Sequence, residues 1–417
     1  MTSAVQTSLA ALAALAAAGS ASAQSRVTVF GVLDAGVSYY QTNSKDRVGT
    51  QPNLRQSQWA LSTGNYAGSR LGFSGTEDLG GGLAVGFWLE AGLANDTGSA
   101  ISPVALFNRR STVSLTSRFG ELRLGRDYTP TFWNDTVFDP FGTVGVGASA
   151  ISMLLGGSGS PGTINALLVN PNYVRAGNAV SYFLPAGLGG LYGQVMYAFG
   201  ENTKYDPGTS TPPNALNTAR TGRYAGGRLG WANGPVDVGA AYGSSTVGDN
   251  YYAGSTKYLN TSNVAGSYDF GPVKLFGEYS YVQLKNDYVS TPQPTGDARV
   301  KGYLLGASVP VGVGLIRVAY SHLQANVDQA AANTSGQDLP EPKADKFSLG
   351  YVHNLSKRTA LYASFAYTKN KNGAALPPAL PPNGSVGYAS PTLADLNQTG
   401  YRADMGYGYD FGIRHSF

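Results

Sequence analysis

Cysteine is absent from this sequence of 417 residues, and histidine occurs only 3 times. The absence of cysteine excludes a disulfide framework and any thiolate chemistry. Charged residues make up only 13% of the chain, whereas 56 residues are glycine and 27 are tyrosine. This composition is typical neither of a soluble α/β enzyme nor of a disordered chain. It suits a barrel whose strands face lipid on one side and a lumen of water and small polar groups on the other.

Long apolar runs are also scarce, and residues 1–23 form the only one. This run is rich in alanine and ends in Ala21-Ser22-Ala23, which has the A-x-A pattern of a signal-peptidase site. We therefore predict a secretory signal peptide over residues 1–23, with the mature chain starting at Gln24. The segment before the apolar core carries no Lys or Arg, which departs from the usual signal pattern. A membrane-spanning helix is the alternative, but the apolar core is shorter than about 18 residues.

The carboxyl-terminal stretch, residues 405–417, alternates between apolar and polar positions. A period of two over this length predicts a strand with one apolar and one polar face. The apolar face includes Tyr409, Phe411, Ile413 and Phe417. We expect this strand to pair with the first one and close a barrel in a bilayer, because closure removes the unpaired edge. The terminal strand of a soluble sandwich is the alternative.

Amphipathic segments recur along the rest of the chain and predict about sixteen strands, an even number as a single-chain barrel requires. The predicted strands cover 27–39, 59–75, 83–91, 108–117, 121–126, 178–184, 191–199, 223–232, 236–244, 262–270, 273–283, 299–309, 315–324, 344–354, 359–369 and 401–417. Short turns alternate with long polar loops between them, which is typical of bacterial outer-membrane barrels. The sequence therefore predicts an all-β transmembrane antiparallel barrel, one domain over residues 24–417, with a water channel inside.

Residues 127–177 interrupt this rhythm, because they are far longer than a typical connection and show no clear strand alternation. The segment becomes rich in glycine and in apolar residues, including Val144, Val146, Ile151 and Leu154. Exterior loops in water are seldom so apolar. We predict that this third loop folds into the lumen, packs on an inner wall and narrows the pore. An elaborate exterior loop or a lid is the alternative.

Several stretches resemble the general porins of Gram-negative outer membranes, most closely those of β-proteobacteria. They are Val27–Gly36, Ser69–Leu83, Phe107–Arg110, Gly120–Asp127, Asn178–Tyr182 and the terminal Phe417. A match spread over the mature chain is more specific than any one short motif. The resemblance implies a homotrimer of barrels with about sixteen strands each. It also implies a third loop at mid-height, and a carboxyl-terminal strand with Tyr409, Phe411, Ile413 and Phe417 that the barrel assembly machinery reads.

Charged residues on the predicted lumen face are the candidates for the pore constriction. Alternation turns five basic residues inward: Arg70, Arg110, Arg123, Arg126 and Arg175. The acidic candidates are Asp127, Asp135 and Asp139, which we expect on the third loop opposite the arginines, and Asp34 and Glu90, which face inward by parity. Charge near a narrow gap sets which ions enter. We predict a field across the pore and a mild preference for anions, although each charge could instead be a solvated residue without effect.

Other functions are less compatible with the sequence. A hydrolase needs a nucleophile with an adjacent base, but parity places His353 and His415 on the lipid side, and the inward His322 has no obvious partner. Inward aromatic residues are few, namely Phe30, Trp88, Tyr192 and Tyr362, and give little support for a sugar channel. No metal site and no cofactor are expected. A nucleic-acid surface is not expected either, since the basic residues are scattered along the chain.

The expected function is passive diffusion of small hydrophilic solutes and ions through the outer membrane, whose lipid surrounds the barrel. A substrate-specific channel for phosphate, sugar or an amphiphile and an adhesin barrel with a plugged lumen are the remaining alternatives.

Overall fold

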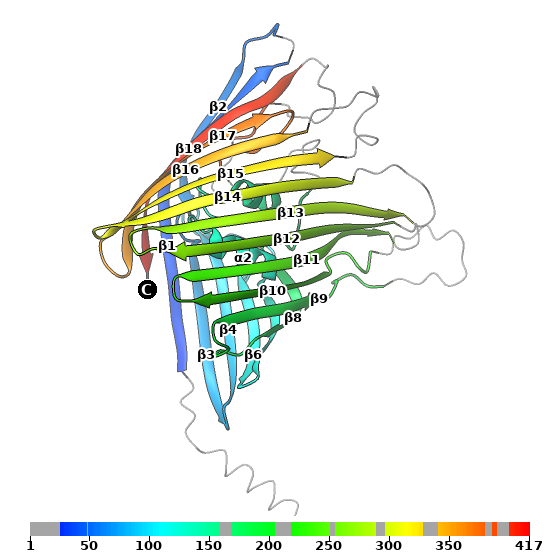
Figure 1. Cartoon of the computed structure of the whole chain (residues 1–417), viewed down its shortest axis with the longest axis vertical. Helices are drawn as coiled ribbons and strands as arrows, with labels where there is room; N and C mark the ends of the chain where they lie inside the picture. Colours follow the sequence, from blue (N-terminus) through cyan, green and yellow to red (C-terminus); the bar gives the residue numbers. More distant parts are fainter. Residues whose placement is uncertain are drawn as a thin grey trace, which may run out of the picture.

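The structure is a computed structural model that describes residues 26–47, 49–157, 168–204, 218–250, 255–288, 297–327, 341–379, 386–389 and 400–417. The predicted signal peptide lies outside these residues. The described chain forms a closed antiparallel β-barrel with two short helices inside it (Figure 1). Within the described residues, no helix has the length and apolar character needed to cross a membrane.

The sheet contains 18 strand segments. Two of these segments, β2 and β3, pair with successive lengths of β1 and together make one strand of the barrel, and the two-residue β5 pairs only with β4. The barrel thus has sixteen strands, as predicted. The segments are β1 (Arg26–Asp46), β2 (Leu54–Thr63), β3 (Arg70–Gly80), β4 (Leu83–Ala94), β5 (Ser99–Ala100), β6 (Arg110–Ser117), β7 (Gly120–Tyr128), β8 (Arg175–Phe183), β9 (Leu191–Ala198), β10 (Tyr224–Asn233), β11 (Val236–Asn250), β12 (Ser255–Asp269), β13 (Lys274–Tyr288), β14 (Ala298–Val311), β15 (Gly314–Val327), β16 (Lys343–Asn354), β17 (Thr359–Lys371) and β18 (Tyr401–Ser416).

The first and last strands close the barrel. β1 and β18 pair antiparallel from Val32 opposite Ser416 to Asp46 opposite Tyr401. Gly31 and Phe417 then exchange two backbone hydrogen bonds of 3.1 Å each. A β-carbon at Gly31 would collide with the Phe417 ring, so the glycine lets the ring lie flat over the seam. Closure leaves no unpaired strand edge in the bilayer, where an unpaired backbone group has no water to bind.

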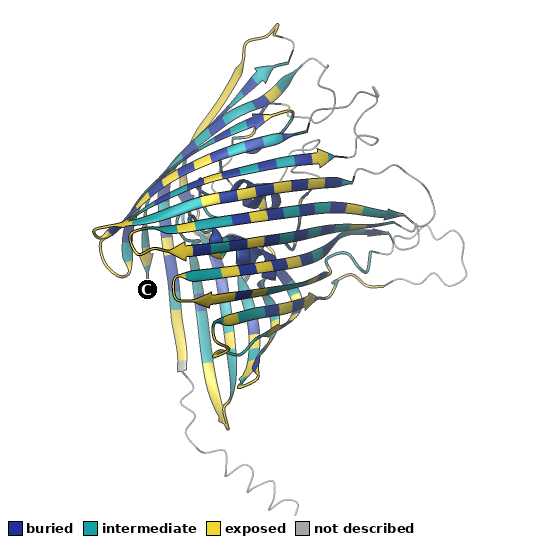
Figure 2. Cartoon of the chain, in the orientation of Figure 1, coloured by how far each residue is buried: buried dark blue, intermediate teal, exposed yellow. Residues whose placement is uncertain are grey.

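Exposed and buried residues alternate along the strands (Figure 2). On β18, Asp410 is fully buried while the neighbouring Phe411 is 53% exposed. The predicted outward residues Ile413 and Phe417 are also exposed. The apolar face of the last strand therefore lies on the outside of the barrel, and its polar face lies inside, as the period of two predicted.

Two features of the strands differ from the predictions. The strand expected over 59–75 is interrupted, because residues 64–69 leave the wall and fold inward, and the Asp34 carboxylate accepts hydrogen bonds from the Tyr66 and Ala67 amides at 2.8 and 2.6 Å. Several strands also run further than expected, and β12 and β13 enter segments predicted as loops. Their backbone ladder continues where the apolar alternation has ended, since hydrogen bonding between strands needs no apolar face.

The tight turns of the described residues, such as those between β3 and β4 and between β10 and β11, lie at one end of the barrel, as predicted. The turn between β3 and β4 consists of Gly81 and Gly82, whose φ angles are 61° and 80°. A two-residue hairpin turn with both residues at positive φ is the type that fits the twist of the strands, and glycine adopts it without strain.

The third loop connects β7 to β8 and folds into the lumen, which confirms the prediction. It contains α2 (Pro130–Phe138) and α3 (Ala150–Gly156), and Figure 1 shows α2 within the barrel. The α2 helix packs against β10–β13, and α3 packs against β14–β16. Leu154 and Leu155 of α3 are buried with wall residues such as Leu259 and Leu323. The apolar character of the loop is thus explained by an apolar patch on the inner wall.

Polar contacts fix the position of the third loop on the wall, which apolar packing alone does not determine. The Val146 amide donates to Oδ2 of Asp410 at 2.8 Å, and the other oxygen of this carboxylate accepts from Ser38 at 2.6 Å. On the opposite side, the Asn263 side chain donates to Asp135 at 2.5 Å. Buried polar groups with defined partners specify one arrangement.

We predict that Asp410→Ala destabilises the folded barrel, because it leaves the buried Val146 amide without its acceptor and removes one partner of the Ser38 hydroxyl. The loss should be about 1–3 kcal/mol, measured by urea unfolding of the detergent-solubilised protein. Asp404→Ala on the same strand removes a carboxylate that binds Lys369 and Lys45 at the partly exposed rim, and is the matched control. Equal losses in both variants would contradict the anchoring role of Asp410.

Candidate functional site: the pore constriction

A cavity of about 590 Å³ lies between the third loop and the wall that the loop leaves uncovered. The loop occupies the side of β10–β16, so the open space borders the strands at the beginning of the chain. Four arginines line it on the wall side: Arg70, Arg109, Arg110 and Arg123. Trp133 and Thr136 of α2 line it on the loop side. This gap is the candidate constriction.

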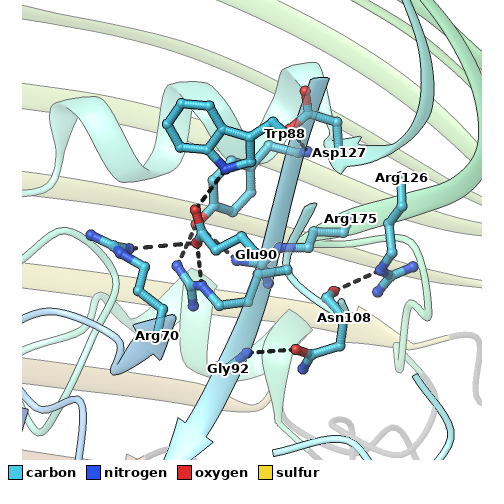
Figure 3. A network of polar contacts seen from close by, with 10 residues as sticks. Arg70, Trp88, Glu90, Gly92, Asn108, Arg126, Asp127 and Arg175 are labelled. Carbon is cyan, nitrogen blue, oxygen red and sulfur yellow. Dashed lines mark hydrogen bonds and ion pairs between the residues drawn. The ribbon is translucent and has the colours of Figure 1, made fainter. Parts of the chain in front are cut away.

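Glu90 of β4 is the centre of the first group of wall charges (Figure 3). Its Oε1 accepts a hydrogen bond from Nε of Arg109 at 2.5 Å and lies 3.9 Å from Nη1 of Arg70. Its Oε2 accepts from the indole nitrogen of Trp88 at 3.0 Å. Glu90 therefore holds two guanidinium groups that would otherwise repel each other.

Asp127 organises the second group, on β6 and β7. Its Oδ2 lies 2.5 Å from Nη1 of Arg123 and 3.7 Å from Nε of Arg110. Arg123 also donates through Nε to Glu121 at 2.9 Å. Asp127 was expected on the third loop, but it lies within β7, on the same wall as the arginines it binds.

Aromatic rings support the arginines from the side. The Arg110 guanidinium lies over Trp88 at 4.7 Å, and that of Arg123 lies over Phe183 at 4.0 Å. Tyr128 lies under Arg175 at 4.3 Å, and its hydroxyl accepts from Arg175 at 2.8 Å and from Arg109 at 3.2 Å. An aromatic face attracts a cation and restricts its movement.

Arg126 was predicted to face the gap, but the structure turns it away. The register of β7 shifts between Gly125 and Asp127, and Arg126 pairs with Ser111, whose neighbours Arg110 and Thr112 face inward. Its Nε donates to the Asn108 carbonyl at 2.7 Å instead (Figure 3). Arg126 lies three residues from the inward Arg123, so strict alternation along β7 already gives it the outer face, and its pairing with β6 is regular.

Three predicted acidic residues also lie elsewhere. Asp135 accepts from Tyr173 and Asn263, and Asp139 caps backbone amides of the loop itself, including that of Phe141 at 2.8 Å. Burial raises the pKa of Asp135, and it raises the pKa of Asp139 to about 6. Asp34 is buried beneath residues 64–69. The expected field between loop acids and wall arginines is thus replaced by arginines and carboxylates on one wall, facing neutral loop residues.

The prediction missed Arg109, because alternation gave it the face opposite to Arg110. It precedes β6, however, and a residue outside a strand does not follow the alternation.

His322 was expected inside, but it lies on the outer surface, where its Nδ1 is 2.7 Å from Asp345 and its ring stacks on Tyr303. Tyr320, two residues earlier, is exposed on the same face, so the parity of β15 itself indicates the outward position.

A closed barrel with a loop in its lumen and a charged gap between loop and wall is a membrane channel. Comparison with known proteins specifies the kind. Residues 8–373 match the model of a Gram-negative porin family. The chain is 39% identical to outer membrane porin protein 32 of Delftia acidovorans over 98% of this chain and 99% of that protein. It is 30% identical to an outer membrane porin of Bordetella pertussis over 88% of this chain and 94% of the other.

Among solved structures, the chain is similar to an anion-selective porin from Comamonas acidovorans, with a TM-score of 0.70 and 33% identity over 94% of this chain and all of that one. The chain belongs to the Gram-negative porin family. It is therefore a channel of the Gram-negative outer membrane for passive diffusion, and it is not an enzyme.

We predict strong energetic coupling between Glu90 and Arg109, because removing one partner leaves the charge of the other unpaired in a wall crowded with charges. A double-mutant cycle with Glu90→Gln and Arg109→Gln, read by urea unfolding, should give a coupling free energy of about 1–3 kcal/mol. The exposed pair Lys285 and Asp287 is the control and should show no measurable coupling. Additive effects at Glu90 and Arg109 would refute the pairing.

Proposed function

We propose that this porin conducts small hydrophilic solutes and prefers anions, with the arginine group on the wall as the selecting element. The observation that carries the proposal is an excess of positive charge at the gap. Four arginines line it, Arg70, Arg109, Arg110 and Arg123, and a fifth, Arg175, is bonded to the lining residue Tyr128. The carboxylates among them are those of Glu90 and Asp127, and that of Glu121 behind Arg123. Charge at a narrow place decides which ions enter a channel.

The opposite side of the gap supports the same sign. Trp133 and Thr136 of the third loop are neutral, while Asp135 and Asp139 are buried with partners of their own. The positive wall is therefore not balanced by acidic residues across the cavity. The similar porin from Comamonas acidovorans is described as anion-selective.

Within this proposal, the predicted site residues have two kinds of role. Arg70, Arg110, Arg123 and Arg175 contribute the field, and Glu90 and Asp127 hold them in place. Asp34, Asp135 and Asp139 position inward-folded segments of the chain rather than contact the solute.

The test is the zero-current potential of single channels in a planar bilayer under a KCl gradient. We expect the sign given by chloride permeation. Arg110→Ala or Arg123→Ala should reduce the ratio of chloride to potassium permeability to about half, since each removes one positive charge from the gap. Arg118→Ala, in the turn of the same hairpin and exposed, is the matched control and should leave the ratio unchanged. A potential of the opposite sign in the unmodified protein would overturn the proposed preference.

The outer surface and the last strand carry two further parts of the proposal. Large apolar and aromatic residues cover the outside, including Tyr39, Trp59 and Tyr409 around the β1–β18 seam, and supply contacts for a homotrimer. The signal peptide over residues 1–23 directs export, and the barrel assembly machinery reads the strand that carries Tyr409, Phe411, Ile413 and Phe417. Cross-linking in detergent should give three subunits.

Phe417→Ser should reduce the amount of folded porin in the outer membrane several-fold, because it removes the terminal ring from the recognised strand. Heat-modifiability on gels of membrane fractions measures the folded fraction. His415→Ser, on the same face of the strand and bonded to Thr359, is the control. If purified Phe417→Ser refolds in detergent as well as the parent but is depleted in membranes, recognition is affected. Equal folding of both variants in membranes would remove Phe417 from the signal.

A further inference from the structure

The cavity at the gap is lined by aromatic rings as well as by arginines. Phe30, Trp88, Tyr128 and Phe183 contribute from the wall, and Trp133 contributes from the third loop. All five are partly exposed. This cavity of about 590 Å³ has aromatic rings on both sides, which a water-filled gap that passes only small ions does not require. This volume lies within the range of about 300–1,000 Å³ that is usual for small-molecule sites.

The wall rings and the loop ring are used differently. Trp88, Phe183 and Tyr128 each have a guanidinium over the ring, at 4.0–4.7 Å. Trp133 instead stacks on Tyr128, with ring centroids 5.2 Å apart and planes inclined by 23°, and the described residues place no cation over it. The wall rings thus lie against arginines, whereas the Trp133 ring has no arginine over it among the described residues.

We propose that the gap is a binding site for planar aromatic carboxylates, which stack on Trp133 and direct their carboxylate to the wall arginines. The inference rests on the proposed anion preference and specifies which organic anions the pore favours. Two adjacent groups of arginines offer the carboxylate its partners, through Arg70 and Arg109 near Glu90 and through Arg110 and Arg123 near Asp127. Guanidinium groups bind a planar carboxylate through paired hydrogen bonds.

Neutral sugars fit this site less well. They stack on aromatic rings, but they would leave the excess of positive charge at the wall without a counter-charge. Small inorganic anions satisfy the arginines but gain nothing from Trp133. A ligand that is both flat and anionic uses both sides of the cavity, since stacking of aromatic rings adds to the free energy of burial.

The experiment compares benzoate with cyclohexanecarboxylate as blockers of the chloride current through single channels. The two anions have the same charge and number of carbon atoms, but only benzoate is flat and aromatic. We expect the half-blocking concentration of benzoate to be about two- to tenfold lower. Trp133→Ala should abolish this difference, and Trp133→Phe should retain most of it.

Tyr192→Leu is the matched control. Tyr192 is also a lumen residue with an arginine over its ring, Arg228 at 4.6 Å, but it does not line this cavity. The two anions should block the current through this variant at the same concentrations as in the parent. Heat-modifiability on gels shows that each variant has folded.

The outcomes separate the two proposals. Cation-selective channels in KCl would overturn the anion preference and with it this site. Anion-selective channels that benzoate and cyclohexanecarboxylate block equally would overturn the site alone. A benzoate advantage that persists in Trp133→Ala would also overturn it, because the stacking partner would then lie elsewhere.

Discussion

The packing of the third loop on one half of the inner wall determines where this barrel can conduct. Apolar residues of α3 and of the wall strands are removed from water together, and Asp410 and Asn263 fix the ends of the packed segment. A barrel of sixteen strands is too wide to fill its lumen with wall side chains. The third loop fills the lumen on one side, so the channel is confined to the other side, where the arginines lie.

The arginine wall is stable because its charges are held in groups. Glu90 and Asp127 each bind two guanidinium groups. Trp88 and Phe183 lie against two of these four, and Tyr128 lies against the guanidinium of Arg175. Like charges packed this closely would repel one another without such partners, and long side chains would move in the lumen. Fewer carboxylates than arginines leave a positive field, and fixed side chains keep that field at one place in the pore.

Alternation along each strand made most of this predictable. The inward positions of Arg70, Arg110 and Arg123 follow from a period of two, and so do the outward positions of Phe411 and Ile413. The prediction failed at two arginines. Arg126 was counted as inward, although alternation from Arg123 gives it the outer face, and Arg109 escaped the pattern because it precedes its strand. Asp135 and Asp139 belong to a loop, where no period exists to indicate direction.

The sequence by itself determined the class of fold, the closing strand and the inward course of an apolar loop, because each depends on a local pattern of apolar and polar residues. Only the tertiary structure decided which wall the loop covers and what faces the arginines. That choice depends on contacts between residues far apart in the chain, such as Val146 with Asp410 and Asp135 with Asn263. Trp133 faces the gap for the same reason, since the docking of α2 on β10–β13 sets the direction of its free face.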